Sequence, residues 1–194
     1  MKFALLIALM SSTAIAAGSK LQSGKYDVEA SHSKVGFGVS HLMISTVEGR
    51  FNTFTGNFEV NDDFKKSTVN LSADTASIST DNVKRDDHLK SADFFEAEKH
   101  KQLIFKSTEI KGSEKSFKLI GDLSIKGVTK KTTFDCKYLG SANDPWGNHR
   151  AGFKCNGKIS RKEFGLTWNK LAEAGPVVGD EVSINIDIEG VKAK

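Results

Sequence analysis

Alternation of apolar and polar residues with a period of two is the feature that most constrains how this chain folds. Successive side chains of a β-strand point to opposite faces, so a strand with one buried face shows this period. The apolar positions follow it in the segments 35–39, 54–60, 69–73, 117–125, 132–138, 151–159 and 182–188. Residues 103–110 are also strand-like, but which of their side chains point inward is ambiguous. The chain is therefore predicted to be all-β.

The same pattern predicts how the strands are arranged. Strands with one apolar and one polar face are typical of antiparallel sheets. About eight of them in sequence, with short connections, favour a closed up-and-down barrel, which has no exposed edge strand. A barrel of about eight strands can hold a ligand where small inward residues leave room, and Gly121 and Gly157 fall on inward faces. Alternation alone does not prove closure, so a β-sandwich is the alternative architecture.

Residues 80–91 interrupt the strand pattern and predict a short helix. Thr80 or Asp81 can cap its first turn, and polar and acidic residues follow. In a barrel, such an insertion covers one mouth as a lid. The candidate lid residues are Arg85, Asp86, His88, Phe94 and Phe95. The two phenylalanines would anchor the lid to the core, while the arginine and the first aspartate would pair with or cap backbone groups near the rim.

The first residues carry the features of an export signal. Lys2 gives a positive start, residues 3–10 form an apolar run, and residues 14–17 contain an Ala-x-Ala site, so we expect cleavage after Ala16 or Ala17. The apolar run is too short to span a bilayer as a helix. Residues 1–17 are therefore predicted to be a signal peptide and residues 18–194 one exported domain, periplasmic in a Gram-negative bacterium.

Charge argues against binding to nucleic acid, and hydropathy argues against an integral membrane protein. The formal net charge is +4, and it is too small and too dispersed to indicate binding to nucleic acid. No second apolar segment reaches membrane-spanning length, so we expect no integral membrane protein.

The two cysteines predict a disulfide. Cys136 and Cys155 lie symmetrically about residues 145–146, so a hairpin centred there places them opposite each other, and exported proteins form disulfides. A preceding hairpin centred on residues 128–129 would place Gly121 opposite Cys136, with space beside the sulfur atoms. The alternative is a pair of reduced, buried thiols.

The sequence carries none of the spacings that indicate a catalytic or metal site. Histidines are scattered, at positions 32, 41, 88, 100 and 149, and there is no His-x-x-x-His or Cys-x-x-Cys spacing. There is also no Gly-x-Ser-x-Gly motif and no phosphate-binding glycine loop. Although His88 and Asp86 could form half of a catalytic arrangement, helix capping and lid anchoring explain them better. We therefore predict no catalytic residue, metal or cofactor, and interpret the chain as a container.

Five segments, in order along the chain, resemble the YceI-like family of exported lipid-binding proteins. Residues 26–41 and 51–58 resemble its first strands. Residues 85–95 are similar to the family pattern Arg-Asp-x-His-Leu-x-Ser-x-Asp-Phe-Phe, which is the most specific of the five. Residues 121–130 resemble Gly-x-Leu-Thr-Ile-x-Gly-x-Thr-Lys, and residues 161–168 resemble Arg-x-x-Phe-Gly-Leu followed by tryptophan.

This resemblance implies a lipocalin-like antiparallel barrel that binds a long polyisoprenoid, such as a prenyl quinone or its precursor. It also implies a homodimer and a binding protein rather than an enzyme. The chain departs from the family in two places, since many relatives have proline where Lys101 stands and threonine where Ser124 stands. The cysteine pair is not a general family feature, so the predicted disulfide depends on this sequence alone.

We expect the inward apolar residues of the strands to line a long cavity and contact the lipid. These candidate ligand-binding residues are Val35, Phe37, Val39, Phe58, Leu71, Leu119, Leu123, Phe134, Phe153, Ile184 and Ile186. Three alternatives stay open: a carrier for fatty acids or fatty amides, a barrel enzyme acting on an apolar substrate, and an envelope interaction protein whose barrel is filled by side chains.

Overall fold

The computed structural model describes residues 20–173 and 175–194, so the predicted signal peptide lies outside the described residues. The strands are β1 (Gly24–Val28), β2 (Lys34–His41), β3 (Ser45–Phe51), β4 (Phe54–Val60), β5 (Thr68–Asp74), β6 (Ile78–Ser79), β7 (Gln102–Ser113), β8 (Ser116–Ile125), β9 (Val128–Asn143), β10 (His149–Ser160), β11 (Leu171–Ala172), β12 (Gly175–Pro176) and β13 (Val178–Lys192). The helix is α1 (Val83–Lys90), and 3-10 turns are η1 (Ala30–His32), η2 (Phe64–Lys66), η3 (Thr75–Ser77) and η4 (Lys162–Phe164).

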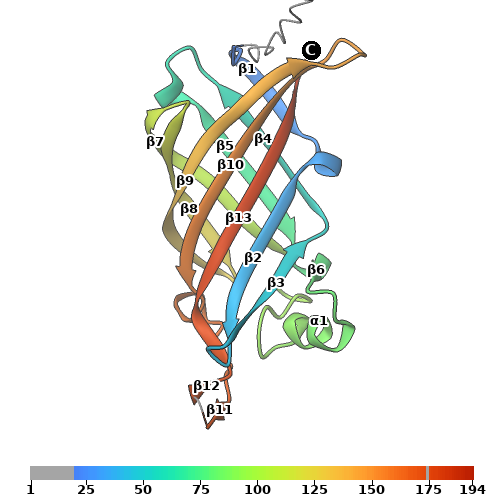
Figure 1. Ribbon diagram of the computed structural model, residues 1–194, viewed down its shortest axis with the longest axis vertical. Coiled ribbons are helices and arrows are strands. Elements are labelled where there is room, and N and C mark those ends of the chain that lie inside the picture. The colour runs from blue at the N-terminus through green and yellow to red at the C-terminus, as the bar shows by residue number, and fades with distance from the viewer. Residues whose placement is uncertain (1–19, 174) are drawn as a thin grey trace, which may run out of the picture.

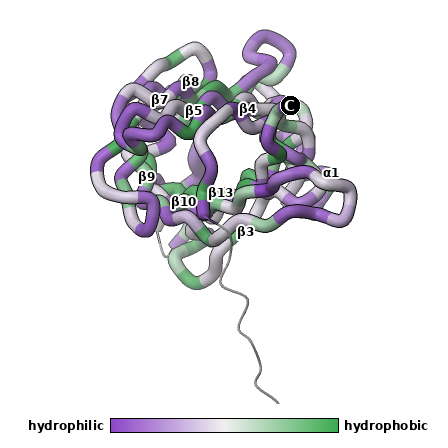
Figure 2. The backbone as a smooth tube through the Cα atoms, turned by 90° about the horizontal axis from the view of Figure 1, so that it is seen from above, coloured by the Kyte–Doolittle hydropathy of each residue, from purple (hydrophilic) through white to green (hydrophobic). Residues whose placement is uncertain are grey.

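Eight antiparallel strands form a closed ring. Neighbours pair in the order β1, β4, β5, β7, β8, β9, β10 and β13, and β13 pairs with β1 to close it. Figure 1 shows the strands crossing the long axis of the molecule, and Figure 2 shows them surrounding that axis. The predicted all-β, eight-stranded antiparallel barrel with a short helix is therefore confirmed, and the sandwich is excluded.

At two positions in the barrel wall, two consecutive short strands take the place of one long strand. β13 pairs with β2 over residues 178–187 and with β1 over residues 190–192, and η1 separates those two partners. Likewise β3 pairs with β2 while β4 pairs with β1. β6 pairs with the end of β3 over two residues only. Residues 80–101 then leave the sheet, and β7 begins beside the end of β5.

The β9–β10 hairpin has the predicted pairing. Cys136 lies opposite Cys155, their Cα atoms are 4.1 Å apart, and the two form a disulfide. Phe153 also lies opposite Tyr138, as predicted. Nearer the turn the register shifts by one at residues 152–153, which is the signature of a β-bulge.

The β8–β9 hairpin corrects the predicted pairing. Its two-residue turn is Lys126-Gly127, both with positive φ, and it places Phe117 rather than Gly121 opposite Cys136. A two-residue turn with two left-handed residues matches strand twist, and glycine adopts this conformation without strain. The register differs from the prediction by four residues, an even number, so the inward faces were predicted correctly although the partners were wrong.

The start of the helix also differs from the prediction. Asn82, rather than Thr80 or Asp81, is the N-cap of α1, and its side chain accepts a hydrogen bond from the backbone N–H of Arg85. Asp81 instead has a positive φ of 59° and pairs with Arg50 at 3.0 Å. No helix in the described part of the chain is long and apolar enough to cross a bilayer.

Candidate lipid-binding cavity

The barrel encloses an apolar cavity that runs along its axis. With the open solvent at its mouth, the empty space within the lining is about 1680 Å³. All eleven candidate ligand-binding residues lie in its lining, contributed by β2, β4, β5, β8, β9, β10 and β13. Alternation places them there because each points to the inner face of its strand. Contact between these residues and a ligand stays a prediction.

Part of the inner wall is not covered by other side chains. Phe37 and Val39 on β2, and Ile184 and Ile186 on β13, point inward yet are only half-buried. A packed interior covers such residues fully, since protein cores have few voids larger than a water molecule. The barrel is therefore not filled through its axis, and the alternative of a barrel filled by side chains is not supported.

The inward glycines do not create the space, contrary to the prediction. A Cβ atom at Gly121 would lie 2.5 Å from the Phe105 ring, and one at Gly157 would lie 2.6 Å from the Phe134 ring. The glycines therefore accommodate aromatic rings of neighbouring strands, which a side chain at either position would meet. This contact depends on which strands are adjacent, so alternation within one strand does not reveal it.

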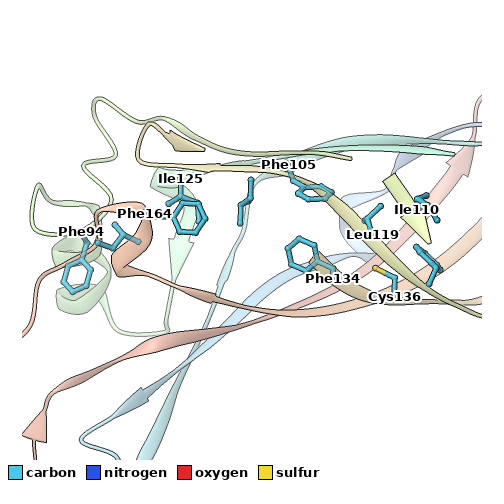
Figure 3. Close-up of a cluster of buried hydrophobic side chains, with 11 residues drawn as sticks. Phe94, Phe105, Ile110, Leu119, Ile125, Phe134, Cys136 and Phe164 are labelled. Atoms are coloured by element: carbon cyan, nitrogen blue, oxygen red, sulfur yellow. The ribbon is translucent and has the colours of Figure 1, made fainter. Parts of the chain in front are cut away.

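One side of the interior is a continuous buried cluster. Figure 3 shows Phe105, Phe134, Leu119, Ile110 and Cys136 gathered along the barrel, with Phe94, Phe164 and Ile125 near one end. The rings of Phe105 and Phe134 meet edge to face, with centroids 5.3 Å apart. Such pairs stabilise a fold by about 0.5–1.5 kcal/mol beyond the area they bury. This rigid side supports the wall that faces the empty space.

One end of the barrel is closed by Tyr26. Its side chain is fully buried and stacks on Phe58, with ring centroids 4.8 Å apart. Its hydroxyl donates a hydrogen bond of 2.8 Å to the carbonyl of Gln22, and burial raises its pKa. His149 lies against the same ring at 6.2 Å and is itself buried. The rings of Tyr26, Phe58 and His149 therefore pack together at this end of the barrel.

The segment predicted to be a lid lies at the other end of the barrel (Figure 1), and its covering of the mouth stays a prediction. Figure 1 shows α1 beside β3 and β6 at this end of the barrel. Phe94 and Phe95, which follow α1, both line the cavity, as does Leu89 within the helix. The lid segment thus contributes apolar side chains directly to the cavity wall.

Two polar lid residues hold α1 to the strand before it. The backbone N–H and the hydroxyl of Thr80 both donate to the buried carboxylate of Asp86, at 2.8 and 2.5 Å. The guanidinium of Arg85 donates to the hydroxyl and the carbonyl oxygen of Thr80, at 2.7 and 2.8 Å. Neither residue lies in the cavity lining.

His88 fixes the lid to the late loop of the chain. Its ring meets the rings of Phe94 and Trp168 edge to face, with centroids 5.1 and 4.8 Å apart. Its Nε2 atom lies 2.9 Å from a carboxylate oxygen of Asp93. Because His88 does not line the cavity, this geometry places it in the attachment of the lid.

Arg161 is a lining residue that was not among the candidates, although it belongs to a segment that resembles the family. Its guanidinium is buried and donates to the backbone carbonyls of Leu166, Trp168, Val178 and Gly179. Burial lowers its pKa, and the nearby carboxylate of Asp180 opposes that shift. It therefore joins the loop after β10 to the start of β13.

Other lining residues were also missing from the candidates. The apolar ones are Val28, Phe51, Val60, Phe64, Val69, Ala73, Leu89, Leu103, Ile104, Phe105, Ile110, Phe117, Ile125, Ile159, Leu166, Val178, Val182 and Ile188. Alternation already marked several of them as inward, so that signal was present. Residues 103–110 were ambiguous because a bulge at Ser107/Glu109 shifts the inward face from odd to even positions.

Outside the cavity, three side chains of the types that bind metal ions in other proteins lie close together. Potential ligand atoms of Glu29, His32 and Glu189 lie within 4.8 Å of one another. These atoms already have partners, since His32 lies 2.5 Å from Glu29 and Arg150 donates to Glu189 at 2.6 Å. Glu29 also caps η1. The group is therefore explained as an ion-pair network that joins the β1–β2 break to β10 and β13.

The fold and the sequence agree with one family of known proteins. The model of the YceI-like domain matches residues 26–190. A UPF0312 protein of Serratia proteamaculans is 42% identical over 182 residues, which cover 93% of this chain and 92% of that protein.

Two solved structures share the barrel. Burkholderia cenocepacia BcnA has a TM-score of 0.75 at 22% identity, covering 84% of this chain and 99% of its own. A domain from Saccharophagus degradans, described as a polyisoprenoid binding domain implicated in plant cell wall breakdown, has a TM-score of 0.63 at 15% identity, covering 87% and 98%. Since the family model spans most of the chain and the Serratia relative is similar over nearly its whole length, the chain belongs to the YceI-like family.

Proposed function

We propose that this protein is an exported carrier or storage protein that binds a long polyisoprenoid lipid, such as a prenyl quinone or its precursor, inside the barrel. The observation that carries the proposal is the long apolar cavity, whose inward wall on β2 and β13 is uncovered. Burial of apolar surface contributes about 25 cal/mol per Å², so an apolar chain gains affinity with few polar contacts. The description of the Saccharophagus domain supports the choice of lipid.

Analysis of the lipid that the protein carries tests this proposal. The chain is purified from its own envelope fraction without detergent, extracted with organic solvent and analysed by mass spectrometry. We expect a polyprenyl lipid bound inside the barrel. Fatty acids or fatty amides would instead support the alternative cargo, and a product formed from an added apolar substrate would indicate an enzyme. The mass of the intact protein also tests export, since cleavage is expected after Ala16 or Ala17.

A variant that fills the cavity distinguishes bound lipid from lipid that adheres to the surface. Phe37 is half-buried and lies over Gly49, so the larger ring of Phe37→Trp extends into the empty space. We expect this variant to fold and to lose the extracted lipid. The matched control is Lys34→Trp, which adds the same ring to the outer face of β2 and should leave the lipid unchanged. Equal lipid in both variants would contradict a path beside Phe37.

The resemblance also predicts a homodimer, which we propose as the assembled form of the carrier. Sedimentation of the purified chain at several concentrations measures this. A monomer at all concentrations would contradict the dimer and leave the carrier proposal intact, since the cavity lies within one chain.

A further inference from the structure

We infer that the end of the barrel formed by the β2–β3 turn and the β11–β12 hairpin docks on a lipid bilayer by inserting Met43, Ile44 and Leu171. These three residues are called the apolar tip below. The inference rests on the proposed function and names its partner, because a lipid cargo has to enter and leave a membrane. It assigns a role to three side chains that neither line the cavity nor belong to the core.

The apolar tip is a compact exposed feature. Met43, Ile44 and Leu171 are 71%, 82% and 87% exposed. The two hairpins that carry them are adjacent, since a Cβ atom on Gly175 would lie 3.7 Å from the sulfur of Met43, and the N–H of Leu42 donates to the carbonyl of Val177 at 2.9 Å. Figure 1 shows β11 and β12 projecting beyond the lower ends of β2 and β3.

The backbone of the β2–β3 turn is strained, and its side chains are unusual for that conformation. Leu42 and Met43 have positive φ values of 51° and 60°, and Ile44 donates to the carbonyl of His41 at 3.1 Å. Turns with two left-handed central residues favour Asn-Gly or Asp-Gly, because bulky side chains are strained there. Leu42 is half-buried, but Met43 gains no burial from this conformation because its side chain is exposed. Strain retained at an exposed site points to a function of the side chain itself.

The tip adjoins the cavity at the end opposite to the Tyr26 closure. Val178, which lies in the cavity lining, pairs with His41 at the base of the β2–β3 turn. Arg161 bonds to the carbonyls of Val178 and Gly179, and the side chain of Asn169 bonds to both backbone groups of Val178. The tip is therefore held in place next to the lid end, where a lipid enters most directly.

The size of the tip fits a bilayer better than a protein partner. Stable protein interfaces bury about 800 Å² on each partner and involve about 20–30 residues a side. The tip consists of three large side chains, two in the β2–β3 turn and one in the two-residue strand β11. A few inserted apolar side chains suffice for reversible attachment to the boundary between headgroups and acyl chains, where binding strength follows the apolar area inserted. A second copy of the chain is the competing partner.

Flotation with vesicles of phosphatidylethanolamine and phosphatidylglycerol tests the inference. The variants are Ile44→Ser/Leu171→Ser and Met43→Gly, and each removes exposed apolar area. We expect vesicle partitioning to fall about tenfold in the double variant and clearly in the single one. Met43→Gly should be at least as stable to heat as the wild type, because glycine relieves the strained turn. The matched control is Trp146→Ser, which removes a 79% exposed aromatic side chain from the β9–β10 turn at the opposite end.

The outcomes separate this inference from the proposed function. Loss of partitioning in the tip variants, with the control unchanged, supports docking through the tip. Wild-type protein that carries lipid but does not float with vesicles overturns the inference and leaves the carrier function standing. Equal loss in Trp146→Ser overturns the choice of this end, and tip variants that lose only self-association in sedimentation make the tip a contact between two copies. Wild-type protein that floats but never holds lipid contradicts the carrier function instead.

Discussion

At the scale of single residues, the buried cation Arg161 joins two segments at one end of the barrel. A buried guanidinium is tolerated only when its donors are satisfied, and here four backbone carbonyls accept them. These carbonyls belong to the loop after β10 and to the start of β13, so one side chain fixes two segments. The same loop carries Trp168, which contacts His88 of the lid.

Replacement of Arg161 tests this role. Arg161→Ala leaves buried carbonyls without donors, and we expect the free energy of unfolding to fall by about 3 kcal/mol. Arg161→Lys should recover part of that loss, because an ammonium group keeps the charge but cannot reach all four acceptors. Urea denaturation of the three proteins measures both changes. A loss below about 0.5 kcal/mol in the alanine variant would show that the carbonyls find other donors.

At the scale of elements, α1 and the segment after it, the predicted lid, are held at one end of the barrel by a few specific contacts. The helix is short and has polar residues on most of its surface, and isolated helices of this length are marginal in water. Its position therefore depends on contacts at its ends, where Asp86 and Arg85 meet Thr80 and His88 meets Trp168. Weakening one of these contacts should loosen the lid before it affects the barrel.

Substitutions of two neighbouring aspartates test whether the predicted lid limits the release of lipid. Asp86→Ala removes a buried acceptor of two hydrogen bonds, so we expect a loss of about 2 kcal/mol in stability and faster release of a fluorescent polyprenyl probe. Asp87→Ala removes an exposed carboxylate one residue away, 3.9 Å from Lys90, and should change neither. The bound lipid should be the same in all three proteins. Equal release rates would show that α1 does not limit exchange.

Glu29, at the break between β1 and β2, makes part of the free energy of unfolding depend on pH. Hydrogen bonding from the Ser31 hydroxyl, and then from His32, lowers the pKa of Glu29 from 4.5 to about 2. Because the pKa in the folded state lies below the unfolded value, ionised Glu29 stabilises the fold above pH 4.5, and this contribution is lost as the pH falls toward about 2. The stability gap between the wild type and Glu29→Gln should therefore narrow over that range.

Denaturation at a series of pH values measures the gap. Ser31→Ala removes the main donor, so it should raise the pKa of Glu29 and move the loss to higher pH. A gap that stays constant from pH 6 to pH 2 would contradict the role given to the Glu29 carboxylate.

At the scale of the whole molecule, the barrel combines a rigid side with an uncovered side. The buried cluster along β7, β8 and β9 packs aromatic rings over glycines, whereas the inner faces of β2 and β13 are half-buried. The disulfide lies between β9 and β10, at the boundary of these two sides, and Cys155 itself lines the cavity. The packed side and the uncovered side therefore face each other across the cavity.

Removal of the disulfide tests its contribution to the global stability. The bridge closes a loop with a sequence separation of 19, for which the chain-entropy model gives about 3 kcal/mol. We expect Cys136→Ala/Cys155→Ala to lose about that much. Reductant should destabilise the wild type by a similar amount and leave the double variant unchanged. Free thiols in unreduced protein, detected by alkylation and intact mass, would contradict the bridge.

The strands, their inward faces, the insertion at residues 80–91 and the cysteine pair were all predictable from the sequence. These features follow from local information, because the period of two belongs to each strand and the cysteine pair depends on one hairpin. The tertiary structure alone decided what fills the space over the inward glycines. The position of the bulge that reverses the inward face of β7 is also a tertiary feature. So are the choice of carbonyls that accept from Arg161 and the proximity of the segments that carry Met43 and Leu171. Each of these depends on how one segment packs against another, which alternation within a single strand does not encode.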